Sequence, residues 1–179
     1  MKTVEKSAWV AKGLEKLGDS GVDTVKVEVL ARELGVTKGS FYWHFTDRSA
    51  LLDALLEHWE QASTLDYFNR VEGAEGETAA TQLERIFSMA FAADGALERA
   101  LRAWAAHEER AAAVLKRVDA RRLKSIAKLM KAHGLEPTDC DARSRMLYAA
   151  FIGEQQLTVA LAAKRRVTMA LSAIDALLR

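Results

Sequence analysis

Residues 26–56 constrain the fold most, because three helical segments follow one another there with only a few residues between them. The first segment has an apolar face made of Leu30, Ala31 and Leu34. It is predicted to end at Gly35, since glycine adopts the left-handed backbone of a helix terminus at little steric cost. The second helix is therefore joined to the first by a tight turn.

The second segment is short and carries an unusual outer face. It runs from an N-cap at Thr37 to Phe45, about two turns. Phe41 and Phe45 are four residues apart and can anchor one face to a core. The remaining faces carry aromatic and polar side chains, which a two-turn helix gains nothing by exposing to water, so we expect them to contact a partner. A helix, a glycine turn and a second short helix are the arrangement that places a helix in the major groove of DNA.

Helical spacing continues on both sides of this pair. The third segment follows an N-cap at Thr46 or Asp47 and is expected to reach about Phe68, before a loop over residues 71–78. Its apolar positions are Leu51, Leu52, Leu55, Leu56 and Trp59. A first helix over residues 3–18 completes a three-helix bundle and ends at residues 19–21. Its predicted buried face consists of Val4, Ala8, Ala11, Leu14 and Leu17.

The stretch after the turn glycine resembles the signature of the TetR (tetracycline-repressor) family of bacterial transcriptional regulators. The matching positions are Gly35, Val36, Thr37, Lys38, Gly39, Ser40, Tyr42, His44, Phe45 and Leu51, with Arg48 where the family usually has lysine. The resemblance covers about a third of the chain, up to about Trp59.

This resemblance implies a DNA-binding role for residues around the turn. The predicted DNA-binding residues are Lys26, Thr37, Lys38, Gly39, Ser40, Tyr42, Trp43, His44 and Arg48. Of these, Thr37, Tyr42 and His44 resemble the phosphate contacts of the family. The positions expected to face the groove are Lys38, Gly39, Ser40 and Trp43. Packing remains the alternative for Tyr42 and Trp43, and plain solvation the alternative for Arg48.

Glu28 departs from the family, which commonly offers threonine and arginine toward DNA in the first turn of this helix. A carboxylate cannot neutralise a phosphate, although it can accept a hydrogen bond from cytosine N4. The simpler explanation is that an acidic residue is favourable at a helix N-terminus. Base contacts from this helix are therefore left open.

Composition favours an all-α protein. Half of the 179 residues are apolar, alanine and leucine dominate, and the only proline is Pro137. We expect about nine helices, in a helix-turn-helix DNA-binding domain (residues 1–46) and a helical effector-binding and dimerisation domain (residues 47–179). The single cysteine, Cys140, cannot form an internal disulfide, and neither a signal peptide nor a membrane-spanning run is visible. We therefore predict a cytoplasmic protein without membrane contact.

Net charge gives no support to DNA binding. The formal total is +1, and residues 1–60 hold eight Lys/Arg against ten Asp/Glu. Charge alone would not identify a nucleic-acid-binding protein. The DNA hypothesis therefore depends on where individual charges lie.

The second half of the chain has five further helical patterns. These lie over residues 83–91 (broken at 94–95), 97–105, 115–130 (ending at Gly134), 142 to about 163 (capped by Thr138 or Asp139), and 167–178. The last two helices, over residues 142–179, carry many small side chains, among them Ala149, Ala150, Gly153, Ala160, Ala170, Ala173 and Ala176. Such faces suggest burial against a second copy, as in TetR-like proteins, or a core within one chain.

The resemblance also implies a small-molecule effector bound by the second half. Aromatic walls with a few polar groups would suit an apolar ligand. The candidates are Phe87, Phe91, Trp104, His107, Tyr148 and Gln155. Ordinary core packing is the alternative for the aromatic residues, solvent exposure for His107 and the dimer interface for Gln155. No catalytic, metal-binding or cofactor-binding pattern is visible.

The leading hypothesis is a homodimeric regulator, a repressor, that binds a palindromic operator in double-stranded DNA and is released by a small molecule. The alternative is a helical ligand-binding or sequestering protein with weak or lost DNA binding, motivated by Glu28 and by the charge balance of residues 1–60.

Overall fold

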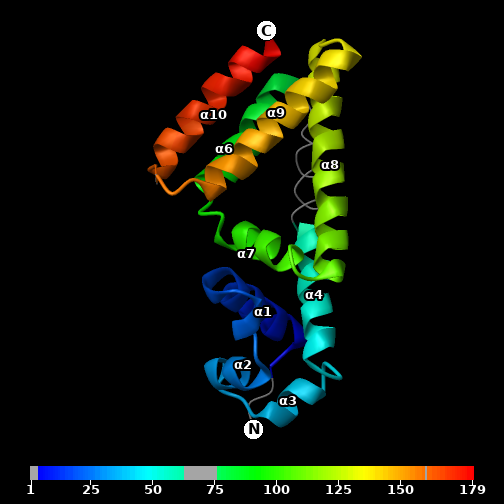
Figure 1. The fold of residues 1–179 in the computed structure, drawn as a ribbon, viewed down its shortest axis with the longest axis vertical. Coiled ribbons are helices and arrows are strands. Elements are labelled where there is room, and N and C mark those ends of the chain that lie inside the picture. The colour runs from blue at the N-terminus through cyan, green and yellow to red at the C-terminus, as the bar shows by residue number, and fades with distance from the viewer. Residues whose placement is uncertain (1–3, 63–75, 160) are drawn as a thin grey trace. The chain divides into compact units, whose positions relative to one another are not determined.

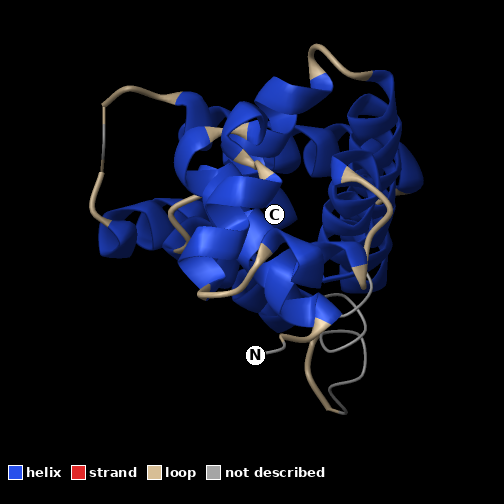
Figure 2. Ribbon diagram, turned by 90° about the horizontal axis from the view of Figure 1, so that it is seen from below, coloured by secondary structure: helices blue, strands red, loops and turns tan. Residues whose placement is uncertain are grey.

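The computed structural model describes residues 4–62, 76–159 and 161–179. Over these residues the chain forms nine α-helices, one short 3-10 helix and no strand (Figures 1 and 2). The predicted all-α class is thereby confirmed. Residues beyond 62 in the predicted extension to Phe68, and most of the predicted loop 71–78, lie outside the described ranges.

The chain divides into two compact units, which do not follow the order of the sequence. Unit 1 consists of Met1–Ser63 and Ala96–Arg117, and unit 2 of Thr64–Gly95 and Val118–Arg179. Unit 1 thus contains more than the three-helix bundle predicted for residues 1–46. The functional boundary at residue 46 stays a prediction.

Unit 1 is built around α1. Its helices are α1 (Lys6–Ser20), α2 (Val27–Leu34), α3 (Lys38–Tyr42), α4 (Arg48–Glu60), α7 (Ala96–Ala105) and the beginning of α8 (Glu109–His133), with the 3-10 helix η1 at Val22–Thr24. A β-carbon on Gly13 of α1 would lie 2.8 Å from a methyl carbon of Leu55 in α4. The absence of a side chain at this position therefore lets α1 and α4 pack closely.

The buried face of α1 differs from the predicted one. The residues that α1 buries are Trp9, Val10, Gly13 and Leu17, whereas Ala11 is exposed. The prediction for Ala11 was wrong because the helix turns its largest side chain, Trp9, into the core. Burial of an aromatic ring contributes more than burial of a methyl group.

The end of α2 and the start of α4 are as predicted, but α3 ends at Tyr42 and not at Phe45, so its predicted length of two turns was wrong. Gly35 has a left-handed backbone (φ 68°, ψ 33°), and its N–H donates to carbonyls of the last turn of α2. Asp47 Oδ1 accepts from the Ala50 N–H at 2.8 Å and caps α4. Thr37 occupies the N-cap position of α3, but its hydroxyl makes no capping hydrogen bond, so that part of the prediction was wrong.

Unit 2 contains α6 (Ala79–Ala92), α8 from Val118 onward, α9 (Pro137–Gln156) and α10 (Ala163–Leu178). All four helices contribute to one apolar core, which includes Leu83 and Phe87 of α6, Ile126 and Met130 of α8 and Leu147 of α9. The predicted break near Asp94 and Gly95 and the helix end at Gly134 are confirmed.

Three helix ends in unit 2 were predicted wrongly. The helix α9 begins earlier than residue 142, with Pro137 in its first turn and Glu136 at the N-cap, so neither Thr138 nor Asp139 is the cap. Proline fits this position because the first N–H of a helix has no intrahelical partner. At the other end α9 stops at Gln156 and α10 starts at Ala163. Arg166 holds the connection, donating to the carbonyls of Phe91, Ala93 and Leu161.

Candidate nucleic-acid interface

The short helix α3 is fixed to the rest of unit 1 by Phe41 and by Phe45, which lies just after the helix. Phe41 is fully buried, and its ring stacks on Phe45 with 5.2 Å between ring centroids. The ring of Trp9 meets Phe41 edge to face at 5.3 Å. A helix of five residues has little stability of its own, so this aromatic cluster determines where α3 lies.

The opposite side of α3 is turned to solvent. Trp43 and Tyr42 are 86% and 61% exposed, and Lys38 and Gly39 are exposed as well. A β-carbon on Gly39 would come within 4 Å only of the Thr37 hydroxyl oxygen, so the backbone of the first turn is open to close approach. Lys26 and Thr37 are also exposed. Tyr42 and Trp43 are therefore not packing residues within this chain.

Ser40 does not face outward. It is only 7% exposed, and its hydroxyl oxygen has no hydrogen-bond partner among the described residues. The prediction that Ser40 faces the groove was wrong. Ser40 and Tyr42 lie at equal angles on either side of Phe41 along a helix, and packing in unit 1 buries the serine side.

Lys38 forms an ion pair with Glu28 across the turn. Its ammonium nitrogen lies 2.7 Å from Glu28 Oε1, and both side chains are about 60% exposed (59% and 60%). The hydrogen bond from Lys38, with the backbone hydrogen bond and the positive charge of Lys38, lowers the pKa of Glu28 below its usual value. Glu28 thus has a specific partner beyond the helix dipole that the sequence suggested.

His44 and Arg48 bond to the backbone of unit 1. His44 Nε2 lies 2.8 Å from the Val4 carbonyl oxygen and donates to it. Arg48 donates through Nε to the Val25 carbonyl and through Nη2 to the Val22 carbonyl, each at 2.6 Å. Arg48 is therefore not simply solvated, and only part of its guanidinium group is available to contact DNA. A phosphate contact by Arg48 must use its remaining N–H groups, and it stays a prediction, as does a phosphate contact by His44.

The predicted effector residues are divided between the two units. Trp104 and His107 belong to unit 1; Trp104 is buried and donates to Glu108, and His107 is exposed. Phe87, Phe91, Tyr148 and Gln155 belong to unit 2. There the rings of Phe87 and Phe91 (6.2 Å) continue through Phe151 to Tyr148 (5.6 and 6.0 Å) within the core. Phe151 was not predicted, although its spacing from Tyr148 could have suggested it.

A buried polar group lies beside these rings. The hydroxyl of Tyr148 donates to Asp119 Oδ1 at 2.7 Å and accepts from Arg122 Nη1 at 3.2 Å. Burial, the largest influence, raises the pKa of Tyr148 to about 12. Tyr148 is thus a neutral hydrogen-bonding group at neutral pH. Gln155 carries a buried side-chain oxygen without a hydrogen-bond partner among the described residues.

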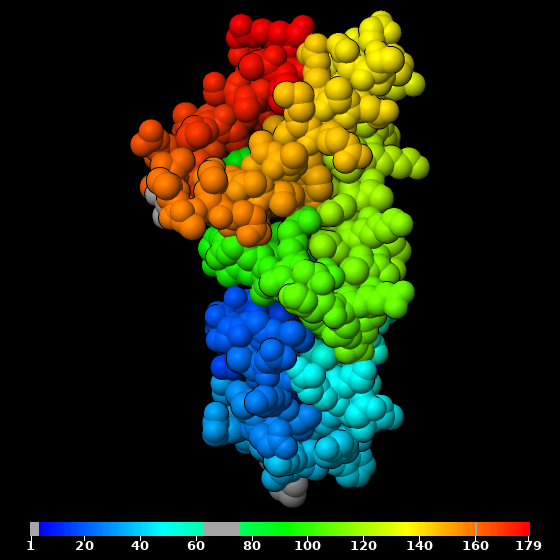
Figure 3. Space-filling model, in the orientation of Figure 1, coloured from blue at the N-terminus to red at the C-terminus, as the bar shows by residue number. Residues whose placement is uncertain are grey.

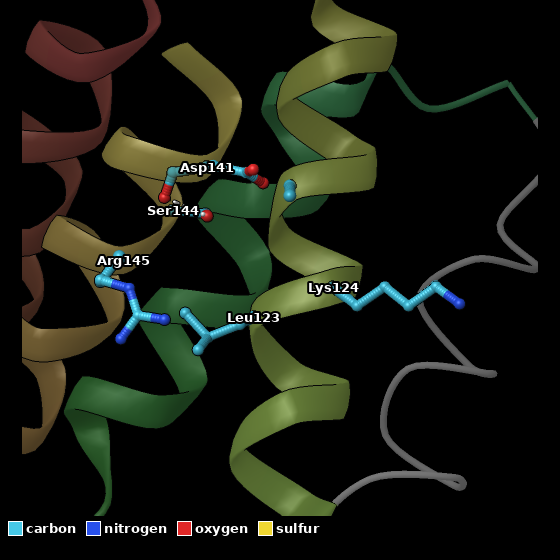
Figure 4. Close-up of a pocket in the computed structure, with 6 residues that line it drawn as sticks. Leu123, Lys124, Asp141, Ser144 and Arg145 are labelled. Carbon is cyan, nitrogen blue, oxygen red and sulfur yellow. Dashed lines mark hydrogen bonds between the residues drawn. The ribbon is translucent and has the colours of Figure 1, made fainter. Parts of the chain in front are cut away.

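A cleft of about 520 Å³ opens between α8 and α9 in unit 2 (Figure 4). Its lining residues are Leu123, Lys124, Ala127, Asp141, Ser144 and Arg145, none of them among the predicted effector residues. Sequence offers no signal for them, since they read as ordinary surface positions of helices. Figure 4 shows Lys124 and Arg145 extending away from each other. The two cations therefore do not converge on a common ligand.

The described residues contain no cluster of three metal-ligating side chains. None of the helices they form has the length and apolar character needed to cross a bilayer.

Known proteins are similar in sequence to the region of this interface. The profile of the family described as "Bacterial regulatory proteins, tetR family" matches residues 10–55. The tetracycline repressor protein class G of Vibrio anguillarum is 42% identical over 57 residues, which are 32% of this chain and 27% of the repressor. The match thus spans about a quarter of the length of that relative.

Solved structures extend the similarity over the chain. A proposed TetR-family transcriptional regulator from Rhodococcus sp. is 25% identical and superposes with a TM-score of 0.76, covering 97% of this chain and 98% of that one. A TetR-family transcriptional regulator from Streptomyces coelicolor shares the fold, with a TM-score of 0.76, 18% identity and coverage of 97% and 95%. Residues 10–55 thus match the TetR family of bacterial regulatory proteins, and the chain shares the helical fold of TetR-family structures.

Proposed function

We propose that the protein is a transcriptional repressor that binds a near-palindromic DNA operator as a homodimer and is released by a small-molecule effector. The observation that carries the proposal is the division of α3 into two faces. Phe41 and Phe45 are held in the core, while Lys38, Tyr42 and Trp43 stand exposed at the end of a glycine turn. Such a rigid outward helix can enter a major groove.

Exposed apolar residues on α9 and α10 support the dimer. These helices lie side by side on the surface of unit 2 (Figure 3). Met146, Leu157 and Met169 are more than half exposed in the single chain, on or next to these helices. Around them are small exposed residues: Ala149, Ala150, Gly153, Ala173 and Ala176. Small side chains allow two helix pairs to approach closely, and a symmetric four-helix interface would cover both.

Binding selection from random-sequence DNA tests the proposal. A dimer with two reading helices should enrich a near-palindrome whose half-sites are about 10 base pairs apart, one helical turn. Light scattering on the purified protein should give the mass of two chains. Enrichment of no motif, with salt-sensitive binding only, would instead favour the ligand-sequestering alternative.

The role of α3 is tested on the selected operator. Lys38→Ala should weaken binding by about 5- to 150-fold and relax the preference at one base pair, if Lys38 reads a base. Thr37→Ala and Tyr42→Phe should weaken binding equally on all sequences, since phosphate contacts carry no sequence information. Operator affinity unchanged by all three substitutions would exclude α3 as the reading helix.

The effector is proposed to bind in unit 2, where the aromatic cluster and the Tyr148 hydroxyl supply an apolar wall and a polar group. The test is a screen of apolar compounds for release of the selected operator. A compound that releases DNA should lose its effect in Tyr148→Phe or Phe91→Ala. Retention of the full effect in both variants would place the effector elsewhere.

A further inference from the structure

The Glu28–Lys38 ion pair joins the two helices of the proposed DNA-reading surface. Glu28 is in the first turn of α2, and Lys38 is the first residue of α3. Only 2.7 Å separates their charged atoms, although ten residues separate them in sequence. Both side chains are largely exposed beside Gly39, whose side of α3 is open.

A lone carboxylate on this surface would oppose DNA, because it repels phosphates. Paired with Lys38, it becomes part of a group with no net charge, which presents one acceptor and one donor side by side. The ammonium group has three N–H donors, of which Glu28 takes one. Two donors and the free lone pairs of the carboxylate therefore remain for bases.

This order of groups matches the major-groove edge of one kind of base pair. Across a C·G pair the edge presents a donor (cytosine N4) and then two acceptors (guanine O6 and N7). Cytosine N4 and guanine O6 are themselves hydrogen-bonded, about 2.9 Å apart. That separation is close to the 2.7 Å between Glu28 Oε1 and Lys38 Nζ. Both protein groups can thus bond to neighbouring base atoms without breaking their own ion pair.

Other base pairs fit this order less well. An A·T pair puts adenine N7, an acceptor, beside the carboxylate and a thymine methyl where Lys38 needs a second acceptor. A reversed G·C pair places acceptors against Glu28 and a donor against Lys38. Each alternative base pair therefore either sets acceptor against acceptor and donor against donor, or leaves one N–H donor of Lys38 without an acceptor.

We propose that Glu28 and Lys38 act together as a neutral specificity-determining unit that reads one C·G pair in each half-site, Glu28 accepting from cytosine N4 and Lys38 donating to guanine O6 and N7. The inference rests on the proposed DNA-binding function. It explains why this surface carries a glutamate, and it predicts how the preference changes when that glutamate is replaced.

Glu28→Gln gives the sharpest test. A glutamine amide pairs with adenine N6 and N7, and Lys38 can then donate to thymine O4. The variant should therefore prefer A·T where the natural protein prefers C·G, with the rest of the motif unchanged. Glu33→Gln is the matched control, since Glu33 is on the same helix and pairs with Lys16 at 2.6 Å.

The experiment compares random-sequence selections by the full-length natural protein, Glu28→Gln and Glu33→Gln. The enriched operator and its C·G-to-A·T exchange are then titrated with each protein by fluorescence anisotropy. The natural protein and Glu33→Gln should prefer C·G by about 5- to 150-fold, and Glu28→Gln should lose or reverse this preference. Circular dichroism verifies that the variants fold.

The outcomes separate this inference from the proposed function. If the natural protein enriches a motif and Glu28→Gln enriches the same one, the reading role of the pair is overturned and the proposed function stands. If the natural protein enriches no motif at all, the proposed function itself is overturned.

Discussion

Replacing Phe41 by alanine is expected to destabilise unit 1 strongly. The Phe41 ring is fully buried and contacts both Trp9 and Phe45. Removal of a buried phenylalanine ring costs about 3–5 kcal/mol, from lost burial and from the cavity that remains. Since a domain is typically stable by about 5–15 kcal/mol, the loss would be a large part of the total. The helix α3 should lose its fixed position first, because five residues do not form a stable helix alone.

Tyr42→Ala is the matched control on the neighbouring residue. Tyr42 is mostly exposed, although its ring packs edge to face with Phe41, so we expect a stability change below about 1 kcal/mol. Its DNA affinity should nevertheless fall, since the hydroxyl proposed to contact a phosphate is gone. Phe41→Ala thus tests how α3 is anchored in the core, and Tyr42→Ala tests its proposed contact with DNA.

Urea unfolding followed by tryptophan fluorescence measures the effect in unit 1. All four tryptophans of the chain, Trp9, Trp43, Trp59 and Trp104, belong to this unit. Circular dichroism of the same samples reports both units, because both are helical. A loss below about 1 kcal/mol in Phe41→Ala, or an equal loss in Tyr42→Ala, would refute the division of α3 into a buried and a reading face.

Three further predictions follow from single contacts. Arg48→Ala should lower the free energy of unfolding by about 1–3 kcal/mol, because it removes two hydrogen bonds to backbone carbonyls; an unchanged urea midpoint would contradict this. Gly35→Ala should cost about 1–2 kcal/mol from its left-handed backbone alone, since no atom crowds the added carbon; a stabilised variant would contradict this. Burial holds the pKa of Tyr148 at about 12 against an ordinary 10.0, so its stabilising contribution is complete below pH 10 and is lost as the pH rises toward 12. The stability advantage of the natural protein over Tyr148→Phe should therefore shrink by about 1 kcal/mol between pH 9 and pH 11, and a constant difference would show that the raised pKa is wrong.

The end of α2 and the start of α4, on either side of α3, could be predicted because single residues determine them. Gly35 and Asp47 each satisfy a local requirement of the backbone, and both do so in the structure. The orientation of Ser40 could not be predicted in this way. Helical spacing gives Ser40 and Tyr42 the same angular distance from Phe41, and only the packing of the other helices decides which is buried.

Contacts between distant residues were invisible in the sequence. His44 bonds to a carbonyl forty residues earlier, and Arg48 to carbonyls 23 and 26 residues earlier. A polar side chain carries no mark of such a partner, so exposure on a DNA-facing surface was the natural expectation. Likewise, the aromatic residues of unit 2 have helical spacing whether they line a ligand site or pack in a core. Phe87 and Phe91 pack in the core here.

The charge distribution of unit 1 bears on how its DNA affinity would arise. Among the cationic side chains of the described residues 4–60, those of Lys12, Lys16 and Lys38 form ion pairs within the unit. Arg48 shares its guanidinium with two backbone carbonyls. Each neutralised phosphate contributes about 0.9 to the slope of the logarithm of the binding constant against the logarithm of the salt concentration. Because few cations of this surface are available to neutralise phosphates, we expect a small slope and weak binding to random DNA. A regulator built this way must obtain its affinity from base contacts and from pairing of two reading helices. The neutral Glu28–Lys38 unit is consistent with that requirement, because it adds sequence preference without adding net charge.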